Sequence, residues 1–127
     1  MSREEDNKAL LRRWYDEMWA HLDFAKIPDL AGPTYTRHDI RGTRAVTAEE
    51  YRDELLPVAT QWKITDFKYF LMAEGDYVTS IGTWKINGQM QWDWVQTFRI
   101  EAGKLVETWL PAMATEGKWE LEEIPGS

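Results

Sequence analysis

A single glutamine interrupts an apolar row of side chains in the last third of the sequence. Between Met90 and Ile100, polar and apolar residues alternate, which is the pattern of a β-strand with one buried face. Gln96 falls on the apolar face of this strand, between Trp94 and Phe98. A buried amide requires hydrogen-bond partners, so Gln96 either belongs to a structural network or contacts a ligand. The row therefore indicates a pocket lined by aromatic rings, without identifying what fills it.

Two adjacent ionisable residues, His38 and Asp39, lie in the segment Tyr35–Ile40, which we expect to be extended. Neighbouring residues of a strand face opposite sides, so only one of the two can face a pocket. Asp39 is the first candidate for a general base, which would remove a proton next to a carbonyl group or activate a water molecule. His38 is the alternative, because histidine titrates near neutral pH. Both have structural alternatives: Asp39 as a turn cap or a partner of Arg37 or Arg41, and His38 as an imidazole with satisfied hydrogen bonds.

Composition argues against several classes of partner. The formal net charge is −7 and the one pair of adjacent basic residues is Arg12-Arg13, whereas proteins that bind nucleic acid through phosphates carry a basic face. The chain has no cysteine, and its two histidines, His21 and His38, are far apart, so no metal site is expected. There is also no glycine-rich phosphate loop. We therefore expect no cofactor, no metal, no nucleic acid and no membrane as partner.

The sequence has the features of a cytoplasmic protein of one domain. Its first residues, MSREEDNK, are charged where a signal peptide would become apolar, and no apolar run approaches the ~20 residues of a membrane span. A chain of 127 residues can bury one core, so we expect a single domain over residues 1–127.

Helical signals dominate the first half of the chain. Ser2 with Glu5, and Thr47 with Glu50, each have the spacing of a capping box, which marks the start of a helix. The first helix carries Tyr15 within an apolar stripe at helical spacing. Most tyrosines in such a stripe are core residues, so a chemical role for Tyr15 competes with a packing role.

From Ile64 onward the hydrophobic period changes from helical to two. Asn87-Gly88 is a strong signal for a two-residue β-hairpin, and strands are expected over Gln89–Ile100 and Lys104–Leu110. Residues 113–127 form an acidic tail. Helices followed by a run of antiparallel strands predict an α+β fold, with N-terminal helices packed on one face of a curved, mainly antiparallel sheet.

Several short phrases of the sequence occur in the order and spacing of one protein family. They are Asn7–Leu10 with Trp14-Tyr15, Tyr35–Asp39 followed by Gly42, Ala73–Val78, and Thr97–Trp109. Together they resemble the SnoaL-like polyketide cyclase group of the NTF2-like superfamily, over residues 5–112. The resemblance implies a cone-shaped α+β barrel. The superfamily includes cyclases, ketosteroid isomerases, dehydratases, epoxide hydrolases and members without catalytic activity, so the fold alone does not decide the function.

One part of the sequence departs from the family pattern. SnoaL-type cyclases carry an acid/base aspartate on the late strands, and many relatives end such a strand in His-Trp-Asp. The corresponding phrase here is Thr108-Trp109-Leu110, which lacks both ionisable groups. The aldol chemistry of those cyclases is therefore not carried over to this chain. Glu107 is a further candidate acid, with a structural ion pair as its alternative.

The resemblance extends to ketosteroid isomerases of the same superfamily and implies roles for particular residues. In an alignment without gaps, their first-helix tyrosine falls on Tyr15, their general base on Asp39 and their second oxyanion donor on Gln96. Asp39, or else His38, would then move a proton while Tyr15 and Gln96 hold an enolate oxygen. The expected function is a cofactor-independent isomerase, cyclase or lyase acting on an apolar carbonyl compound of polyketide, steroid or terpenoid type. Non-catalytic binding of a small molecule by the same fold is the alternative.

Aromatic side chains are expected to form the ligand site. Eight tryptophans are many for a chain of this size, and helices fill only part of the interior of a cone-shaped barrel. We expect some rings to line the remaining cavity and to bind a small apolar or aromatic ligand. The candidates are Trp84, Trp92, Trp94, Phe98 and Trp109.

The resemblance also implies a homodimer, because these folds often pair through the outer face of the sheet. An exposed polar row is expected on that face. It comprises Thr79, Thr83, Gln91, Asp93 and Thr97.

Overall fold

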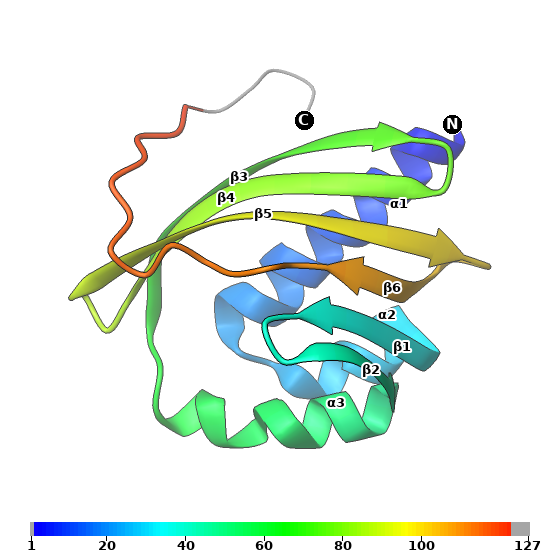
Figure 1. The fold of residues 1–127 in the computed structure, drawn as a ribbon, viewed down its shortest axis with the longest axis horizontal. Helices are drawn as coiled ribbons and strands as arrows, with labels where there is room; N and C mark the ends of the chain where they lie inside the picture. The colour runs from blue at the N-terminus through cyan, green and yellow to red at the C-terminus, as the bar shows by residue number, and fades with distance from the viewer. Residues whose placement is uncertain (1, 123–127) are drawn as a thin grey trace.

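A curved sheet of six strands forms one layer of the structure (Figure 1). The computed structural model describes residues 2–122, so residues 123–127 of the expected acidic tail lie outside the described part. The strands follow the order β2-β1-β6-β5-β4-β3, and neighbours are antiparallel except for β1 with β6, which are parallel. Their bounds are β1 Ala31–Asp39, β2 Gly42–Thr47, β3 Ile64–Glu74, β4 Tyr77–Ile86, β5 Met90–Glu101 and β6 Lys104–Trp109.

Helical segments form the second layer, on the concave side of the sheet. Figure 1 shows α1 crossing beneath the long strands, and α3 closing the opposite end beside β1 and β2. This arrangement confirms the predicted α+β fold, with N-terminal helices on a curved, mainly antiparallel sheet. Among residues 2–122, no helix is both long and apolar enough to cross a membrane. The helical segments are α1 Arg3–Arg12, η1 Arg13–Met18, η2 Trp19–His21, η3 Phe24–Lys26, α2 Ile27–Leu30, α3 Ala48–Leu55 and η4 Leu56–Thr60.

The predicted capping residues begin two of these helices. The Thr47 hydroxyl accepts a hydrogen bond from the Glu50 amide (3.0 Å), and the Glu50 carboxylate accepts one from the Thr47 amide (2.9 Å), which completes a capping box. At α1, the Ser2 hydroxyl accepts a hydrogen bond from the Glu5 amide (3.1 Å). Each cap of this kind stabilises its helix by about 1 kcal/mol. Both helix starts could therefore be located from the sequence.

The continuation of α1 supplies the centre of the core. Segment η1 is a π-helical turn, which is wider than an α-helical turn, and it buries Trp14, Tyr15 and Met18 against the sheet. The Trp14 ring packs edge-on against Phe98 on β5, with ring centroids 6.3 Å apart. Tyr15 lies 4.8 Å from the ring of Tyr69 on β3. The core therefore lies between η1 and the middle of the sheet.

A glycine on β4 makes room for a tryptophan on β5. Gly82 and Trp94 are direct cross-strand neighbours, and both are buried. A β-carbon on Gly82 would overlap the Trp94 indole. The absence of a side chain at Gly82 therefore lets the Trp94 ring approach the backbone of β4 closely.

The segment after β6 covers part of the outer face of the sheet. Asp93 and Ala114 exchange two backbone hydrogen bonds of 2.9 Å, and the Trp119 amide donates to the Asp93 carboxylate (3.2 Å). Thr83 and Asp93 are consequently buried. The expectation that these two residues belong to an exposed outer row is wrong, because strand alternation says nothing about a chain segment that returns over the same face.

We predict that Gly82→Ala lowers the free energy of unfolding by about 1–3 kcal/mol, because the added methyl group displaces the Trp94 ring. Urea denaturation measures the change. In a Trp94→Leu background the same substitution should cost less, since the ring that it meets is gone. An equal cost in both backgrounds would show that the close approach of Gly82 and Trp94 is not the cause.

Candidate functional site

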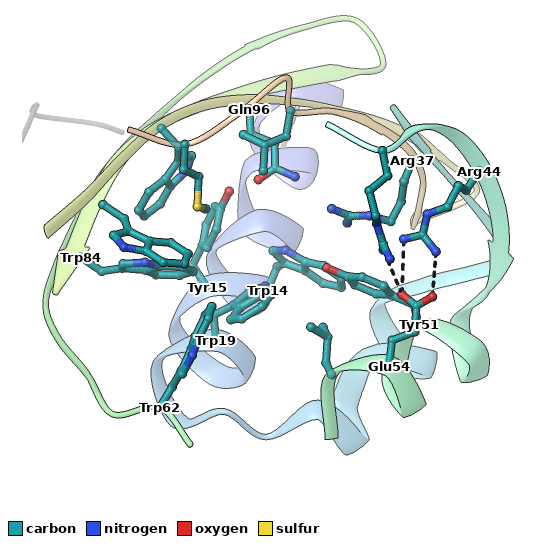
Figure 2. A pocket seen from close by; sticks show the side chains of 16 residues that line it. Trp14, Tyr15, Trp19, Arg37, Arg44, Tyr51, Glu54, Trp62, Trp84 and Gln96 are labelled. Carbon is teal, nitrogen blue, oxygen red and sulfur yellow. Dashed lines mark hydrogen bonds and ion pairs between the residues drawn. The ribbon is translucent and has the colours of Figure 1, made fainter. Parts of the chain in front are cut away.

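A cavity of about 440 Å³ lies between the inner face of the sheet and the helical layer (Figure 2). Its volume falls within the range of small-molecule sites. The residues that line it come from η1, η2, α3, four strands and the loops outside these elements, so no short stretch of sequence contains the site. They are Trp14, Tyr15, Trp19, Arg37, Arg41, Arg44, Tyr51, Glu54, Leu55, Trp62, Trp84, Trp92, Trp94, Gln96, Leu110 and Met113.

One end of the cavity is a wall of tryptophans. The predicted ligand-binding residues Trp84, Trp92 and Trp94 all line it. Trp84 and Trp94 have ring centroids 4.7 Å apart, and Trp62 meets Trp92 edge-on at 5.2 Å. Trp19 packs 5.4 Å from Trp84. This end therefore presents ring surfaces of the kind that bind flat apolar molecules.

The opposite end is charged. Figure 2 shows Arg37, Arg44 and Glu54 across the cavity from Trp84. The Arg44 guanidinium donates to both carboxylate oxygens of Glu54, at 2.7 and 3.4 Å. The Arg37 guanidinium lies over the Tyr51 ring, with its carbon 4.6 Å from the centroid, which is a favourable cation–π contact. The cavity is thus amphipathic along its length.

Gln96 lies between the two ends and is oriented by a short chain of hydrogen bonds. The Thr108 hydroxyl donates to the Thr97 carbonyl (2.9 Å), so its oxygen accepts from Gln96. The Gln96 atom 2.9 Å from Thr108 must therefore be the nitrogen, Nε2. The carbonyl oxygen, Oε1, and the second N–H of the amide have no hydrogen-bond partner among residues 2–122. Both groups remain available to a ligand.

Tyr15 also lines the cavity, but its hydroxyl has a partner within the protein. The hydroxyl lies 2.7 Å from the Ser80 hydroxyl, which in turn donates to the Gln96 carbonyl of the main chain (3.4 Å). Burial raises the pKa of Tyr15, so the phenol stays protonated at neutral pH. The Tyr15 hydroxyl can donate a hydrogen bond to a ligand only when its hydrogen bond with Ser80 is broken.

Asp39 lies beside the cavity, behind two arginines, and does not line it. Its carboxylate accepts hydrogen bonds from the Arg41 amide (2.9 Å) and Arg37 Nε (3.2 Å), and Arg44 lies 3.9 Å away. Its side chain is 11% exposed. Burial acts to raise the pKa of Asp39, but the hydrogen bonds from Arg41 and Arg37 outweigh it and hold the pKa below its usual range. A carboxylate held in this way is a weak base.

His38 projects to the other side of β1, on the outer face of the sheet. Its ring contacts the Glu107 carboxylate (2.7 Å) and the Thr43 hydroxyl (2.8 Å), and it stacks on the Trp109 ring at 5.2 Å. Glu107 also accepts from Arg99 Nε (2.9 Å), so it forms the structural ion pair that was its alternative. Neither His38, Glu107 nor Trp109 lines the cavity.

Two further candidates for ligand binding lie outside the cavity for different reasons. Phe98 faces inward but is buried beneath Trp14. Trp109 faces outward because the pairing of β5 with β6 shifts register after Arg99, which places both Leu105 and Thr108 inside. An irregularity of this kind reverses the alternation of all later side chains. Trp109, a candidate for ligand binding, therefore lies on the outer face beside His38.

Sequence reasoning missed several residues of the site. Arg37 shares a strand face with Tyr35 and Asp39, so alternation along β1 could have placed it inside. Tyr51 is on an apolar helix stripe that gave no sign of facing a cavity. Trp19 begins the short 3-10 helix η2 and Trp62 lies in the loop before β3, and no sequence signal placed either beside a cavity. In the part of the chain that the structure describes, no group of three histidine, aspartate or glutamate side chains is arranged to hold a metal ion.

Comparison with known proteins assigns the family. A model of the SnoaL-like domain matches residues 11–108. The chain belongs to the SnoaL-like family. No curated protein matches the sequence significantly.

Solved structures share the fold of this SnoaL-like chain at low sequence identity. A provisionally named polyketide cyclase from Acidithiobacillus ferrooxidans has a TM-score of 0.75 and 17% identity, covering 87% of this chain and 89% of its own. A provisionally named ketosteroid isomerase from Kribbella flavida has a TM-score of 0.70 and 16% identity, covering 99% and 95%. An NTF2-like protein of unknown function from Burkholderia xenovorans has a TM-score of 0.69 and 15% identity, covering 93% and 88%. These similarities confirm the NTF2-like fold.

The lowered pKa of Asp39 leads to a prediction for stability. A carboxylate with a folded-state pKa below its unfolded value of about 4 stabilises the fold above that pH, and this contribution is lost as the pH falls. Asp39→Asn should therefore lower the free energy of unfolding by about 1–3 kcal/mol at neutral pH, and the difference from wild type should shrink at acidic pH. Urea denaturation at both pH values measures it. Asp53→Asn, at an exposed residue paired with Arg52, is the control; a difference for Asp39→Asn that does not change with pH would contradict the ion pair.

Proposed function

We propose that this protein binds a flat, largely apolar small molecule carrying at least one oxygen function, in the cavity between the tryptophan wall and the arginine end. A single observation carries this proposal: the cavity of about 440 Å³ is lined by aromatic rings at one end and by hydrogen-bonding groups in the middle and at the other end. Small-molecule sites typically combine apolar walls with a few polar groups at fixed positions. The family and the NTF2-like fold agree with it.

The contacts available in the cavity define the shape of the ligand. Trp84, Trp92 and Trp94 offer ring surfaces, and each Å² of apolar ligand surface removed from water contributes roughly 25 cal/mol. Gln96 offers one acceptor and one remaining donor near the centre. A carbonyl or hydroxyl oxygen on a fused-ring or aryl body satisfies both sets of contacts.

Proton transfer on that ligand is the second candidate function. Two observations favour it: Asp39 lies on the inner face of β1 beside the cavity, and two structural neighbours carry the provisional names polyketide cyclase and ketosteroid isomerase. In this candidate a carbon-bound proton passes to Asp39, and the electron pair passes to the carbonyl oxygen as an enolate held by Gln96 and Tyr15. The reaction would be an isomerisation, cyclisation or dehydration without a cofactor.

The geometry supports binding better than catalysis. Asp39 is separated from the cavity by Arg37, and its lowered pKa weakens it as a base. The alternative base, His38, belongs to the outer face and would have to cross the sheet. Proton transfer therefore requires Asp39 to exchange its bonds with Arg37 and Arg41 for contact with the ligand.

The binding proposal is tested by tryptophan fluorescence. We expect acetylnaphthalene, a flat aryl ketone, to change the emission in a saturable way, because several indoles line the cavity. Trp92→Leu should weaken binding by about tenfold through lost ring contact. Trp119→Leu is the matched control, since Trp119 is half exposed and outside the cavity. Absence of saturable binding, or equal weakening by both substitutions, would count against the proposed site.

The catalytic candidate is tested by hydrogen exchange at the ligand. If the protein abstracts a proton, acetylnaphthalene in D₂O should gain deuterium next to its carbonyl faster with protein than in buffer, as measured by NMR. Asp39→Asn should abolish the excess exchange while binding persists. Saturable binding with hydrogen exchange at the buffer rate would contradict proton transfer and support binding as the function.

We further propose that the chain forms a homodimer through the outer face of the sheet. Val95 and Met72 are exposed there, beside half-buried Phe70 and Ile81 on adjoining strands. An apolar surface on one face of a sheet is typical of subunit contacts. Light scattering would give a monomer mass if this proposal is wrong.

A further inference from the structure

We propose that the ligand of this cavity carries an anionic oxygen group, such as a carboxylate, and that Arg37 binds it. The inference rests on the proposed binding function and deepens it by naming the class of ligand. The carboxylate would lie at the arginine end, with the apolar body of the ligand against the tryptophan wall.

The charges at the arginine end do not balance. Three guanidinium groups, those of Arg37, Arg41 and Arg44, face two carboxylates, those of Asp39 and Glu54. Asp39 pairs with Arg37 and Glu54 with Arg44, so the one positive charge in excess is that of the more exposed Arg41, in a chain whose formal net charge is −7. A local cationic surplus within a protein of negative overall charge favours an anion at that position.

Arg37 combines burial with two terminal nitrogens that are free to donate. The residue is 9% exposed, and its Nε donates to Asp39 (3.2 Å). Its two terminal nitrogens, Nη1 and Nη2, have no hydrogen-bond or ion-pair partner among residues 2–122, although the side chain lines the cavity. A buried guanidinium with free terminal nitrogens presents a planar fork that matches the two oxygens of a carboxylate.

The other two arginines are less suited to this role. Both terminal nitrogens of Arg44 are occupied by Glu54, at 2.7 and 3.4 Å. The Arg41 side chain is 62% exposed, so water screens its charge. Arg44 keeps a single Nε without a partner, so of the three arginines Arg37 is the one that offers both terminal nitrogens to a carboxylate.

The surroundings of Arg37 hold its fork in place. Asp39 fixes Nε, while the rings of Tyr51 and Tyr35 lie 4.6 and 5.7 Å from the guanidinium carbon. Asp39 is in this view a positioning residue, which acts on the ligand through Arg37. A fork held by a carboxylate and two rings loses little freedom when it binds an anion, and this favours affinity.

A matched pair of probes tests the charge of the ligand. Naphthoic acid and its methyl ester share one ring system and differ in the anionic oxygen group. By isothermal titration calorimetry, we expect the wild-type protein to bind the acid about tenfold or more tightly than the ester at neutral pH. Arg37→Gln should abolish the preference, so that the variant binds the acid and the ester with about equal affinity.

Two further variants separate recognition from stability and from general charge. Arg37→Gln leaves Asp39 without its partner, so the double variant Arg37→Gln/Asp39→Asn removes both charges together and keeps the net charge of the wild type. It should show the same loss of preference for the acid. Arg52→Gln removes one positive charge from α3 outside the cavity, at a residue paired with Asp53, and should bind both probes as the wild type does.

The outcomes distinguish this inference from the proposed function. Equal binding of acid and ester by the wild type would overturn the inference that the ligand is anionic. The proposal that the cavity binds a ligand would still stand. A preference for the acid that persists in a folded double variant would overturn the role of Arg37. Failure of both probes to bind would overturn the proposed function and this inference with it.

Discussion

The packing of Trp14 and Tyr15 against the inner face of the sheet determines where the core ends and the cavity begins. Both rings come from the π-helical turn η1, and both contact Phe98 at the middle of β5. On one side of this contact the space between helices and sheet is filled. On the other side the sheet curves away, and the rings of Trp84, Trp94 and their neighbours line open space. The cavity therefore begins where the side chains of η1 no longer fill the space against the sheet.

The arginine end of the cavity places a cost on the fold. A guanidinium that is nearly buried loses hydration, and its ion pair with a carboxylate seldom recovers the whole of this cost. Apolar residues at positions 37 and 39 would pack without that penalty. Arg37, Asp39 and Arg44 nevertheless form a connected cluster beside an aromatic cavity. The cluster therefore adds little stability beyond what apolar residues at the same positions would supply.

The same cluster bears on the choice between a binding protein and an enzyme. A general base must be free to take a proton, whereas Asp39 is held by two hydrogen bonds and a second arginine. Those bonds orient Arg37 well and make Asp39 a poor base. Recognition and proton abstraction thus place opposite demands on one carboxylate, and its present contacts favour recognition.

Local patterns in the sequence were sufficient for the elements of the fold and for part of the site. The alternation along β5 placed Trp92, Trp94 and Gln96 on one face, and the capping residues located α1 and α3, because such signals depend only on near neighbours. The resemblance of several phrases to one family supplied the NTF2-like fold, which those signals alone would have left open.

Only the tertiary structure decided which inward residues meet open space and which meet the core. Phe98 and Trp94 share a strand face, yet one lies beneath Trp14 and the other lines the cavity. Trp109 lies on the outer face because the pairing of β5 with β6 shifts register. Asp39 lies on the inner face of β1, but its carboxylate accepts hydrogen bonds from Arg37 and Arg41. A sequence determines periodicity through local geometry, whereas cavities, register shifts and ion pairs depend on how distant segments meet.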